Sequence, residues 1–255
     1  MAKRNEKNGL VWYSFSVFEP FPELVHGAMA RFGGTCEPDG ALHLAFNDRL
    51  PHEQVRTNIR RVEEALGLPG LALVRQTHSA NVTVVRPQDD YHPQGPDEIR
   101  QDCDAMIAPE PGVGLLIRLA DCQGIILYDP RTGVLGLVHS GWRGSVRNIL
   151  GATVDLMAEH GAAPADIRAG ISPSLGPCCA EFVNYRQELP ESFQEFMIRP
   201  NHFDFWAISR KQLTDKGLAP NNIEAAGICT KCSAEFFSYR RGDWGRFGVA
   251  AGVIR

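Results

Sequence analysis

Apolar residues follow two different periods along the chain, and these periods separate predicted strands from predicted helices. Short runs rich in β-branched and aromatic residues, bounded by glycine, proline or aspartate, are typical of strands. Such runs lie at 10–18, 23–34, 71–78, 81–87, 112–120, 124–129, 134–139, the start of 166–182 and 222–230, and two more are expected within 235–255.

Three segments repeat apolar residues every three or four positions instead, which predicts amphipathic helices. These segments are 51–70, 145–161 and 204–220. In the first, an apolar stripe runs from Val55 to Leu66 and a glycine ends it. The polar, proline-containing stretch 87–104 predicts a loop. Because strands and helices are mixed without strict βαβ alternation, the pattern predicts one α+β domain over residues 1–255 with an extensive sheet.

Composition narrows the class of protein without identifying it. Of the 255 residues, 44% are hydrophobic and 22% are charged, which is typical of a globular chain. A net charge of -4 gives no reason to expect a nucleic-acid partner. We therefore interpret the basic start, AKRNEK, as part of a frayed terminus over residues 1–9. No apolar window is long enough to predict a membrane span, so no membrane partner is expected. An odd number of cysteines without an export signal predicts reduced thiols in the cytoplasm.

The predicted hairpin around DPRTG carries Cys122 and His139 close to its two strand ends. If Tyr128 faces Val134, then Cys122 faces Ser140, one residue away from His139. Facing residues have Cβ atoms about 4.5–5.5 Å apart, and a single bulge shifts the register by one. The pattern therefore predicts that Cys122 and His139 are neighbours, where catalytic groups often lie.

The sequence allows several chemical roles for Cys122 and His139. His78, in RQTHSAN, is a second strand-end histidine. Two histidines and one cysteine suit a catalytic zinc ion with an open fourth position. A metal-free enzyme could instead use Cys122 as nucleophile and His139 as base, which leaves His78 without a role. Both residues could also be ordinary buried or hydrogen-bonded side chains.

A copper-dependent phenol oxidase of the multicopper type is disfavoured by the histidine pattern. Such a site needs many imidazoles, with His-x-His pairs for the trinuclear cluster. The chain has eight histidines and none of these pairs. Copper can nevertheless bind a site of two histidines and one cysteine, because it competes well with zinc for nitrogen and sulfur ligands.

Two arginines are candidate anion ligands. Arg143 lies in GWRGS, directly after His139, where a predicted helix begins. Backbone N–H groups at a helix start attract anions, and glycines let a ligand approach the backbone. Arg31 precedes Gly33 and Gly34, and arginine binds phosphate in bidentate fashion.

Four further cysteines form two pairs in the sequence, and these pairs indicate a function less specifically. Cys229 and Cys232 make a C-x-x-C, which suits a redox pair or half of a zinc site. No second C-x-x-C completes a structural zinc site, so we predict two buried or partly exposed thiols. Cys178 and Cys179 are adjacent, cannot easily bridge each other, and are expected at a helix start near the pocket.

The motifs together resemble the laccase-domain proteins, a family once described as multicopper polyphenol oxidases. Its members are regarded as zinc-dependent purine nucleoside phosphorylases with adenosine deaminase activity. The resemblance rests on HGAMARFGG, RQTHSANV, DCDAMIAPEPGVGLLIRLADCQGIILYDP, GVLGLVHSGWRG, ISPSLGPCCAEF and ICTKCSAEFFSYRRGDWGRFG. These segments cover nearly the whole chain from about residue 24. The resemblance implies a single α/β domain of mixed sheets flanked by helices, in four α/β/β/α-like layers.

The same resemblance implies the site. His78, Cys122 and His139 would be the metal ligands, with zinc as the cofactor and copper as a possible substitute. Adenosine, inosine and methylthioadenosine, together with phosphate, are the implied substrates. Deamination needs a proton shuttle, for which Asp121 is our candidate. The chain departs from the family pattern at Ser79, Ser140, Ala45 and His43; His43 is a candidate for substrate binding. The sequence leaves the oligomeric state open.

Overall fold

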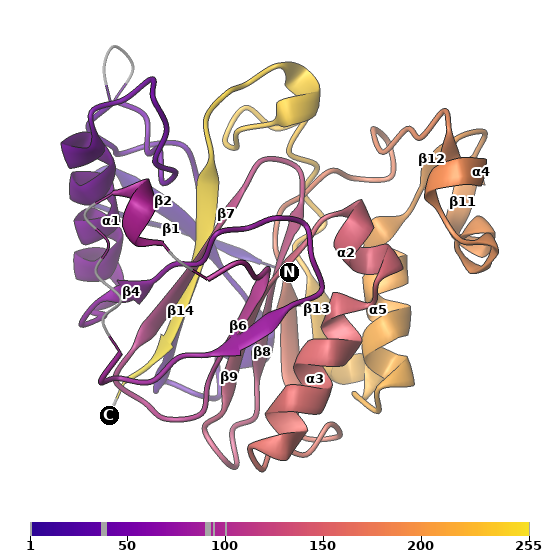
Figure 1. The fold of residues 1–255 in the computed structure, drawn as a ribbon, viewed down its shortest axis with the longest axis horizontal. Helices are drawn as coiled ribbons and strands as arrows, with labels where there is room; N and C mark the ends of the chain where they lie inside the picture. The colour runs from indigo at the N-terminus through magenta and orange to yellow at the C-terminus, as the bar shows by residue number, and fades with distance from the viewer. Residues whose placement is uncertain (1, 37–39, 90–92, 94, 100, 255) are drawn as a thin grey trace.

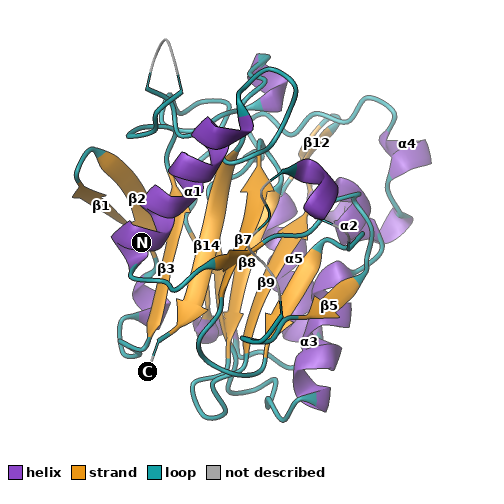
Figure 2. Ribbon diagram, turned by 60° about the vertical axis from the view of Figure 1, so that its left-hand side comes forward, coloured by secondary structure: helices purple, strands orange, loops and turns teal. Residues whose placement is uncertain are grey.

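Two mixed six-stranded sheets form the centre of the molecule in the computed structural model, which describes residues 2–36, 40–89, 93, 95–99 and 101–254 (Figures 1 and 2). In spatial order, the first sheet contains β1 (Lys3–Lys7), β2 (Leu10–Ser14), β3 (Leu24–Met29), β14 (Phe247–Val253), β7 (Gly114–Leu119) and β4 (Leu71–Ala72). The second contains β13 (Ile223–Ala225), β10 (Arg168–Ile171), β8 (Gln123–Tyr128), β9 (Leu135–Ser140), β6 (Ala105–Ala108) and β5 (Val82–Val84).

Helices cover the two outer faces, while the inner faces of the sheets pack on each other. The helix α1 (His52–Leu66) buries its apolar stripe against the first sheet, in one apolar cluster with Leu116 and Ala250. On the other side, α3 (Ile149–Glu159) and α5 (Phe205–Asp215) pack against the second sheet (Figure 2). The predicted α/β/β/α layering of mixed sheets and helices is therefore confirmed. No helix among the described residues is long and apolar enough to cross a membrane.

Shorter elements complete the chain. They are α2 (Trp142–Val146), α4 (Tyr185–Glu188), the strand pair β11 (Met197–Arg199) and β12 (His202–Phe203), and the 3₁₀ turns η1 (Ser16–Phe18), η2 (Pro96–Glu98), η3 (Glu191–Phe196), η4 (Pro220–Asn222) and η5 (Tyr239–Arg241). The segment between β10 and α5 that holds α4, β11 and β12 has its own small apolar cluster around Phe203 and Ile208.

The expectation of a frayed terminus over residues 1–9 is wrong. Lys3–Lys7 form β1, which pairs antiparallel with β2. The turn between them is Asn8-Gly9, and both residues have positive φ, 53° and 78°. An Asn-Gly turn between two strands is among the strongest hairpin signals in a sequence, and the sequence interpretation overlooked it.

Other expected elements differ in extent. The expected helix at 145–161 is divided into α2 and α3 by Asn148, which adopts φ 54° and caps α3. The segment 71–78 is a strand only at Leu71–Ala72, and the tail contains one strand, β14, where two were expected. The expected loop 87–104 holds η2 in its described part; residues 90–92, 94 and 100 lie outside the described residues.

Candidate metal and substrate site

His78, Cys122 and His139 meet at one end of the two sheets. Their ligand atoms all lie within 4.8 Å of one another, and Cys122 Sγ is 3.8 Å from His78 Nε2. His78 lies in the loop between β4 and β5, Cys122 in the turn between β7 and β8, and His139 within β9. The predicted proximity of Cys122 and His139 is therefore found, with His78 beside them.

The register that brings them together differs from the predicted one. In the β8–β9 hairpin Tyr128 faces Leu135 and Gly124 faces His139, one step further from a direct Cys122–His139 pair. Cys122 instead reaches His139 from the turn that carries the chain from the first sheet to the second. Asp121 in that turn has φ 87°, a left-handed conformation that reverses the chain sharply.

A glycine makes room for the three side chains. A Cβ atom placed on Gly141 would lie 2.9 Å from Cys122 Sγ and 2.9 Å from His78 Cδ2. Real Cβ contacts are not this short, so any larger residue here would displace the cysteine or the histidine. The first glycine of GWRG thus provides space for the ligand set.

Asp104 holds two of the three candidate ligands, and sequence reasoning missed it. Its fully buried carboxylate accepts a hydrogen bond from His139 Nδ1 at 2.7 Å. The same carboxylate accepts the backbone N–H groups of Thr77, His78 and Ser79, at 3.2, 3.0 and 2.6 Å. The signal was present in the motif DCDAM, where an aspartate directly precedes an apolar strand.

The electrostatics prepare these groups to bind a cation. Burial alone would raise the pKa of the Cys122 thiol, but the charge of His139 and hydrogen bonds with both histidines outweigh it and lower the pKa to about 6. Burial acts to lower the pKa of His139, yet the neighbouring thiolate and the Asp104 carboxylate raise it to about 9. The cysteine is therefore available as a thiolate near neutral pH, which is the form that binds metals.

The residues fit a tetrahedral metal ion. Zinc binds histidine nitrogen at about 2.0–2.1 Å and cysteine sulfur at about 2.3 Å, which places the two ligand atoms about 3.6 Å apart in a tetrahedron. The observed 3.8 Å between Cys122 Sγ and His78 Nε2 is close to this. The hydrogen bond from His139 Nδ1 to a carboxylate is also the usual support of a zinc-binding histidine. The donor set does not identify the metal, because copper binds the same ligands.

A large cavity of about 1050 Å³ opens beside the three residues. This volume is at the upper end of what small-molecule sites usually enclose. Its aromatic lining consists of Phe46, Trp142, Phe182, Phe205 and Tyr239. Its charged lining consists of the arginines 75, 118, 143, 240 and 246 and the acids Asp121, Glu181 and Glu188. Flat apolar rings and an excess of arginine suit a ligand with a planar group and an anionic group.

Two of the other predicted site residues line this cavity. The exposed Arg143 lies in the short helix α2 with its guanidinium 4.2 Å from the centre of the Trp142 ring. Asp121 accepts hydrogen bonds from the Thr230 hydroxyl at 2.6 Å and from the Arg240 backbone N–H at 2.7 Å. Asp121 therefore fixes the loop after β13 to the turn that carries Cys122.

Arg31 and His43 are absent from the lining of the cavity in the described part of the chain. The Arg31 guanidinium stacks on the Phe237 ring at 4.5 Å and lies 4.0 Å from Asp243. His43 is 4% exposed and stacks between the rings of Phe237 and Trp244. The position of these two residues supports a role in packing, and their predicted contact with substrate gains no support from it.

The chain is similar to known proteins in both sequence and fold. Residues 25–255 match the family described as multi-copper polyphenol oxidoreductase laccase. A purine nucleoside phosphorylase of Deinococcus radiodurans is 32% identical over 243 residues, 90% of this chain and 89% of that protein. An adenosine deaminase, RL5, from an unknown prokaryotic organism is 30% identical over 190 residues, 68% of this chain and 71% of that protein. The crystal structure of YlmD from Geobacillus stearothermophilus has a TM-score of 0.85 and 28% identity, with 98% of each chain covered.

Proposed function

The chain belongs to the family of multi-copper polyphenol oxidoreductase laccases, and we propose that it acts as a purine nucleoside phosphorylase with metal-dependent adenosine deaminase activity. Its proposed substrates are phosphate with adenosine, inosine or methylthioadenosine. The proposed metal is zinc, held by His78, Cys122 and His139. The proposed compartment is the cytoplasm, since all seven cysteines are free thiols in the structure.

One observation carries this proposal: the three ligand residues lie at the wall of a cavity that also presents arginines and aromatic rings. A metal site that served stability alone would use four protein ligands and would not open onto a cavity. When bound, the metal ion supplies a Lewis acid that makes water nucleophilic at neutral pH, which is the chemistry that deamination requires. The aromatic side chains provide stacking surfaces for a purine.

Phosphorolysis requires an anion held beneath the ribose, and Arg143 is our candidate for it. Among the described residues, the other four cavity arginines donate hydrogen bonds to neighbouring protein groups. The Arg143 guanidinium lies over the Trp142 ring and has no hydrogen-bond partner among the described residues, so its N–H donors are available to a ligand. Arginine presents these donors in a planar fork that matches two phosphate oxygens.

Product analysis tests the proposal. Protein purified without added metal should contain zinc and should convert adenosine and phosphate to adenine and ribose 1-phosphate. Without phosphate it should release inosine from adenosine. Cys122→Ala should bind far less metal at this site, stay folded and lose deamination most strongly. Full metal occupancy of the site in Cys122→Ala, or no turnover of any of the three nucleosides by the wild type, would contradict the proposal.

The variant Asp121→Asn tests which of two roles the Asp121 carboxylate has. As a proton shuttle Asp121 would matter for deamination alone, because only that reaction must move protons to an amino group. As an anchor of the loop through Thr230 and Arg240, it would matter for both reactions. We propose the shuttle role, and an equal loss of both activities would replace it with the anchoring role.

A metal-free Cys/His hydrolase is the second candidate, since Asp104, His139 and Cys122 are arranged as an orienting acid, a base and a nucleophile. His78 distinguishes the two functions. Loss of activity on chelation, with recovery on zinc addition, supports the metal enzyme. Activity that survives chelation but not alkylation of Cys122 supports the hydrolase. Phenol oxidation, if present, should be slow and should require added copper.

A further inference from the structure

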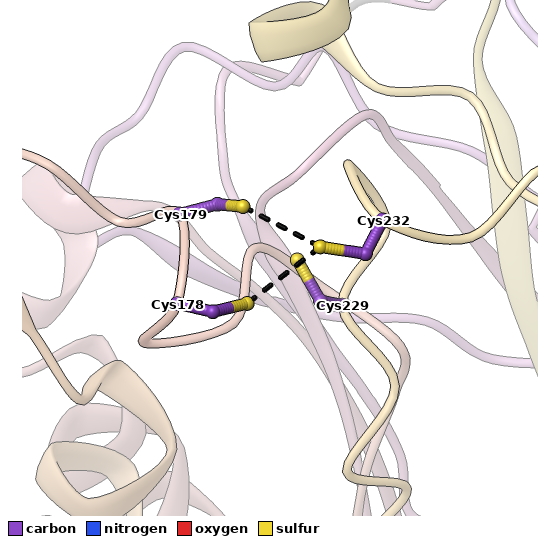
Figure 3. Close-up of side chains that lie close together, drawn as sticks. All are labelled: Cys178, Cys179, Cys229 and Cys232. Atoms are coloured by element: carbon purple, nitrogen blue, oxygen red, sulfur yellow. Dashed lines mark hydrogen bonds between the residues drawn. The ribbon is translucent and has the colours of Figure 1, made fainter.

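Four cysteines from two distant segments gather at the surface of the molecule (Figure 3). Cys178 and Cys179 lie in the loop after β10, and Cys229 and Cys232 lie in the loop after β13. All four sulfur atoms lie within 4.8 Å of one another. The C-x-x-C is therefore completed by an adjacent cysteine pair rather than by a second C-x-x-C.

The spacing of the sulfur atoms matches that of a bound tetrahedral ion. Cys232 Sγ lies 3.5 Å from Cys179 Sγ and 3.7 Å from Cys178 Sγ. Four thiolates that bind zinc at about 2.3 Å are separated by about 3.8 Å along each edge of the tetrahedron. A disulfide would need about 2.05 Å, and all four cysteines are free thiols.

The backbone around the cluster is shaped for this approach. A Cβ atom on Gly176 would lie 2.9 Å from Cys229 Cβ and 3.4 Å from Cys178 Sγ, so glycine allows the two loops to meet. A parallel bridge between Ser174 and Cys229 joins the loops through their backbones.

We propose that Cys178, Cys179, Cys229 and Cys232 bind a second metal ion, zinc, in a four-thiolate structural site. Four sulfur ligands leave no open position, so this ion would not take part in the reaction. Zinc is the expected ion because tetrahedral thiolate sets select it over harder cations.

The ion would hold together two segments that line the cavity. The loop with Cys178 and Cys179 continues into Ala180 and Phe182, which line the cavity. The loop with Cys229 and Cys232 continues to Tyr239 and Arg240, which line it as well, and the Arg240 side chain donates a hydrogen bond to the Glu181 backbone oxygen at 3.0 Å. A metal ion bound between the loops would therefore fix these two lining segments relative to each other without touching substrate.

Metal counting and cobalt spectroscopy on the full chain test this site. In a Cys122→Ala background, which removes one ligand of the cavity site, the protein should retain about one zinc per chain. Cobalt(II) added to the metal-free variant should give the strong thiolate-to-cobalt charge-transfer bands of a tetrahedral four-sulfur site. Adding Cys178→Ser and Cys232→Ser should abolish these bands and weaken cobalt binding by more than about a hundredfold, beyond what loss of an outer-shell partner costs.

Controls separate this result from general effects. Cys103→Ala in the same Cys122→Ala background removes a buried thiol outside the cluster and should leave the cobalt bands unchanged. Peptide mapping of wild type purified without reductant tests the alternative of a redox pair, and it should find no disulfide among the four cysteines. Absence of thiolate bands in Cys122→Ala, or a disulfide between the two loops in place of zinc, would overturn the proposal.

Discussion

The imidazole of His139 and the carboxylate of Asp104 form a buried pair, with Nδ1 2.7 Å from Oδ1 and exposed fractions of 4% and 0%. The pair fixes the His139 ring so that Nε2 is the nitrogen left for a metal ion or for Cys122. Because the same carboxylate also accepts backbone N–H groups at 77–79, one side chain positions both candidate histidine ligands. Hydrogen bonds from Ser79 and His139 hold the pKa of Asp104 well below its usual range although burial acts to raise it.

Asp104→Asn should weaken zinc binding at the cavity site by about tenfold to a hundredfold, as loss of an outer-shell carboxylate usually does. The amide can accept one hydrogen bond but carries no charge to stabilise the imidazole. Competition with a chromophoric chelator measures the affinity. The measurement is made in a Cys178→Ser/Cys232→Ser background, so that only the cavity site binds zinc. Asp102→Asn is the matched control, since Asp102 is exposed and pairs with Arg75. Unchanged affinity in Asp104→Asn would show that the pair does not support the metal site.

Gly141→Ala should weaken metal binding at the cavity site while leaving the fold intact. The backbone at Gly141, with φ -82° and ψ 175°, is accessible to alanine. The new methyl group would nevertheless overlap Cys122 Sγ and His78 Cδ2. Overpacking of this kind costs about 1–3 kcal/mol, or roughly fivefold to a hundredfold in metal affinity.

The control for this prediction is Gly144→Ala on the same short helix. A Cβ atom there would lie 3.3 Å from Ile149 Cγ2 and 3.7 Å from the backbone oxygens of His139 and Ser79, and these are its nearest neighbours, so it would not overlap a ligand atom. Zinc content and circular dichroism should separate the two variants. Equal zinc content in both, with normal folding, would count against the close-packed ligand set.

Apolar periodicity predicted the mixture of strands and helices, and strand ends made His78, Cys122 and His139 candidates, because both are local signals. The four layers were implied only by the resemblance to the family. Sequence reasoning missed the role of Asp104 and the gathering of Cys178 with Cys229, since both depend on how distant segments meet. The β8–β9 register illustrates the limit. The predicted pairing was counted from the DPRTG turn between β8 and β9. Cys122 instead approaches His139 from the turn between β7 and β8, where Asp121 has φ 87°, and no periodicity in the sequence reveals that conformation. Arg31 was a candidate by residue type and His43 by its departure from the family pattern, but the fold stacks both on Phe237.

His26 should make the protein less stable as the pH falls from 6.5 towards 4. Burial between Phe15 and Phe18 lowers the pKa of His26 to about 4, and its Nε2 accepts the Phe15 backbone N–H at 2.9 Å. The unfolded chain binds a proton at His26 below pH 6.5, whereas the folded chain does not until about pH 4. This group therefore stabilises the fold fully above pH 6.5 and loses up to about 3 kcal/mol of that contribution by pH 4.

Urea unfolding between pH 4 and pH 7 measures this effect. In His26→Gln the amide oxygen can still accept the Phe15 N–H, but no proton is taken up, so the slope of stability against pH should decrease. His160→Gln, directly after the outer helix α3, should keep the slope of the wild type. A slope in His26→Gln that equals the wild-type slope would assign the pH dependence to other groups.

Arg143→Ala should weaken phosphorolysis more than deamination, because only phosphorolysis must hold a free anion. A charge-assisted hydrogen bond is worth about 1.5–3 kcal/mol, which corresponds to roughly tenfold to a hundredfold in rate at about 1.4 kcal/mol per decade. The loss should appear mainly as a higher KM for phosphate, since the guanidinium binds the anion rather than the purine. Arg131→Ala is the control, as Arg131 is exposed and pairs with Asp166, outside the residues that line the cavity. Chromatography of products with and without phosphate gives both rates from one preparation. If Arg143→Ala lowers both activities equally and leaves the KM for phosphate unchanged, then Arg143 supports the nucleoside or the stacking on Trp142, and the anion must bind at another of the cavity arginines.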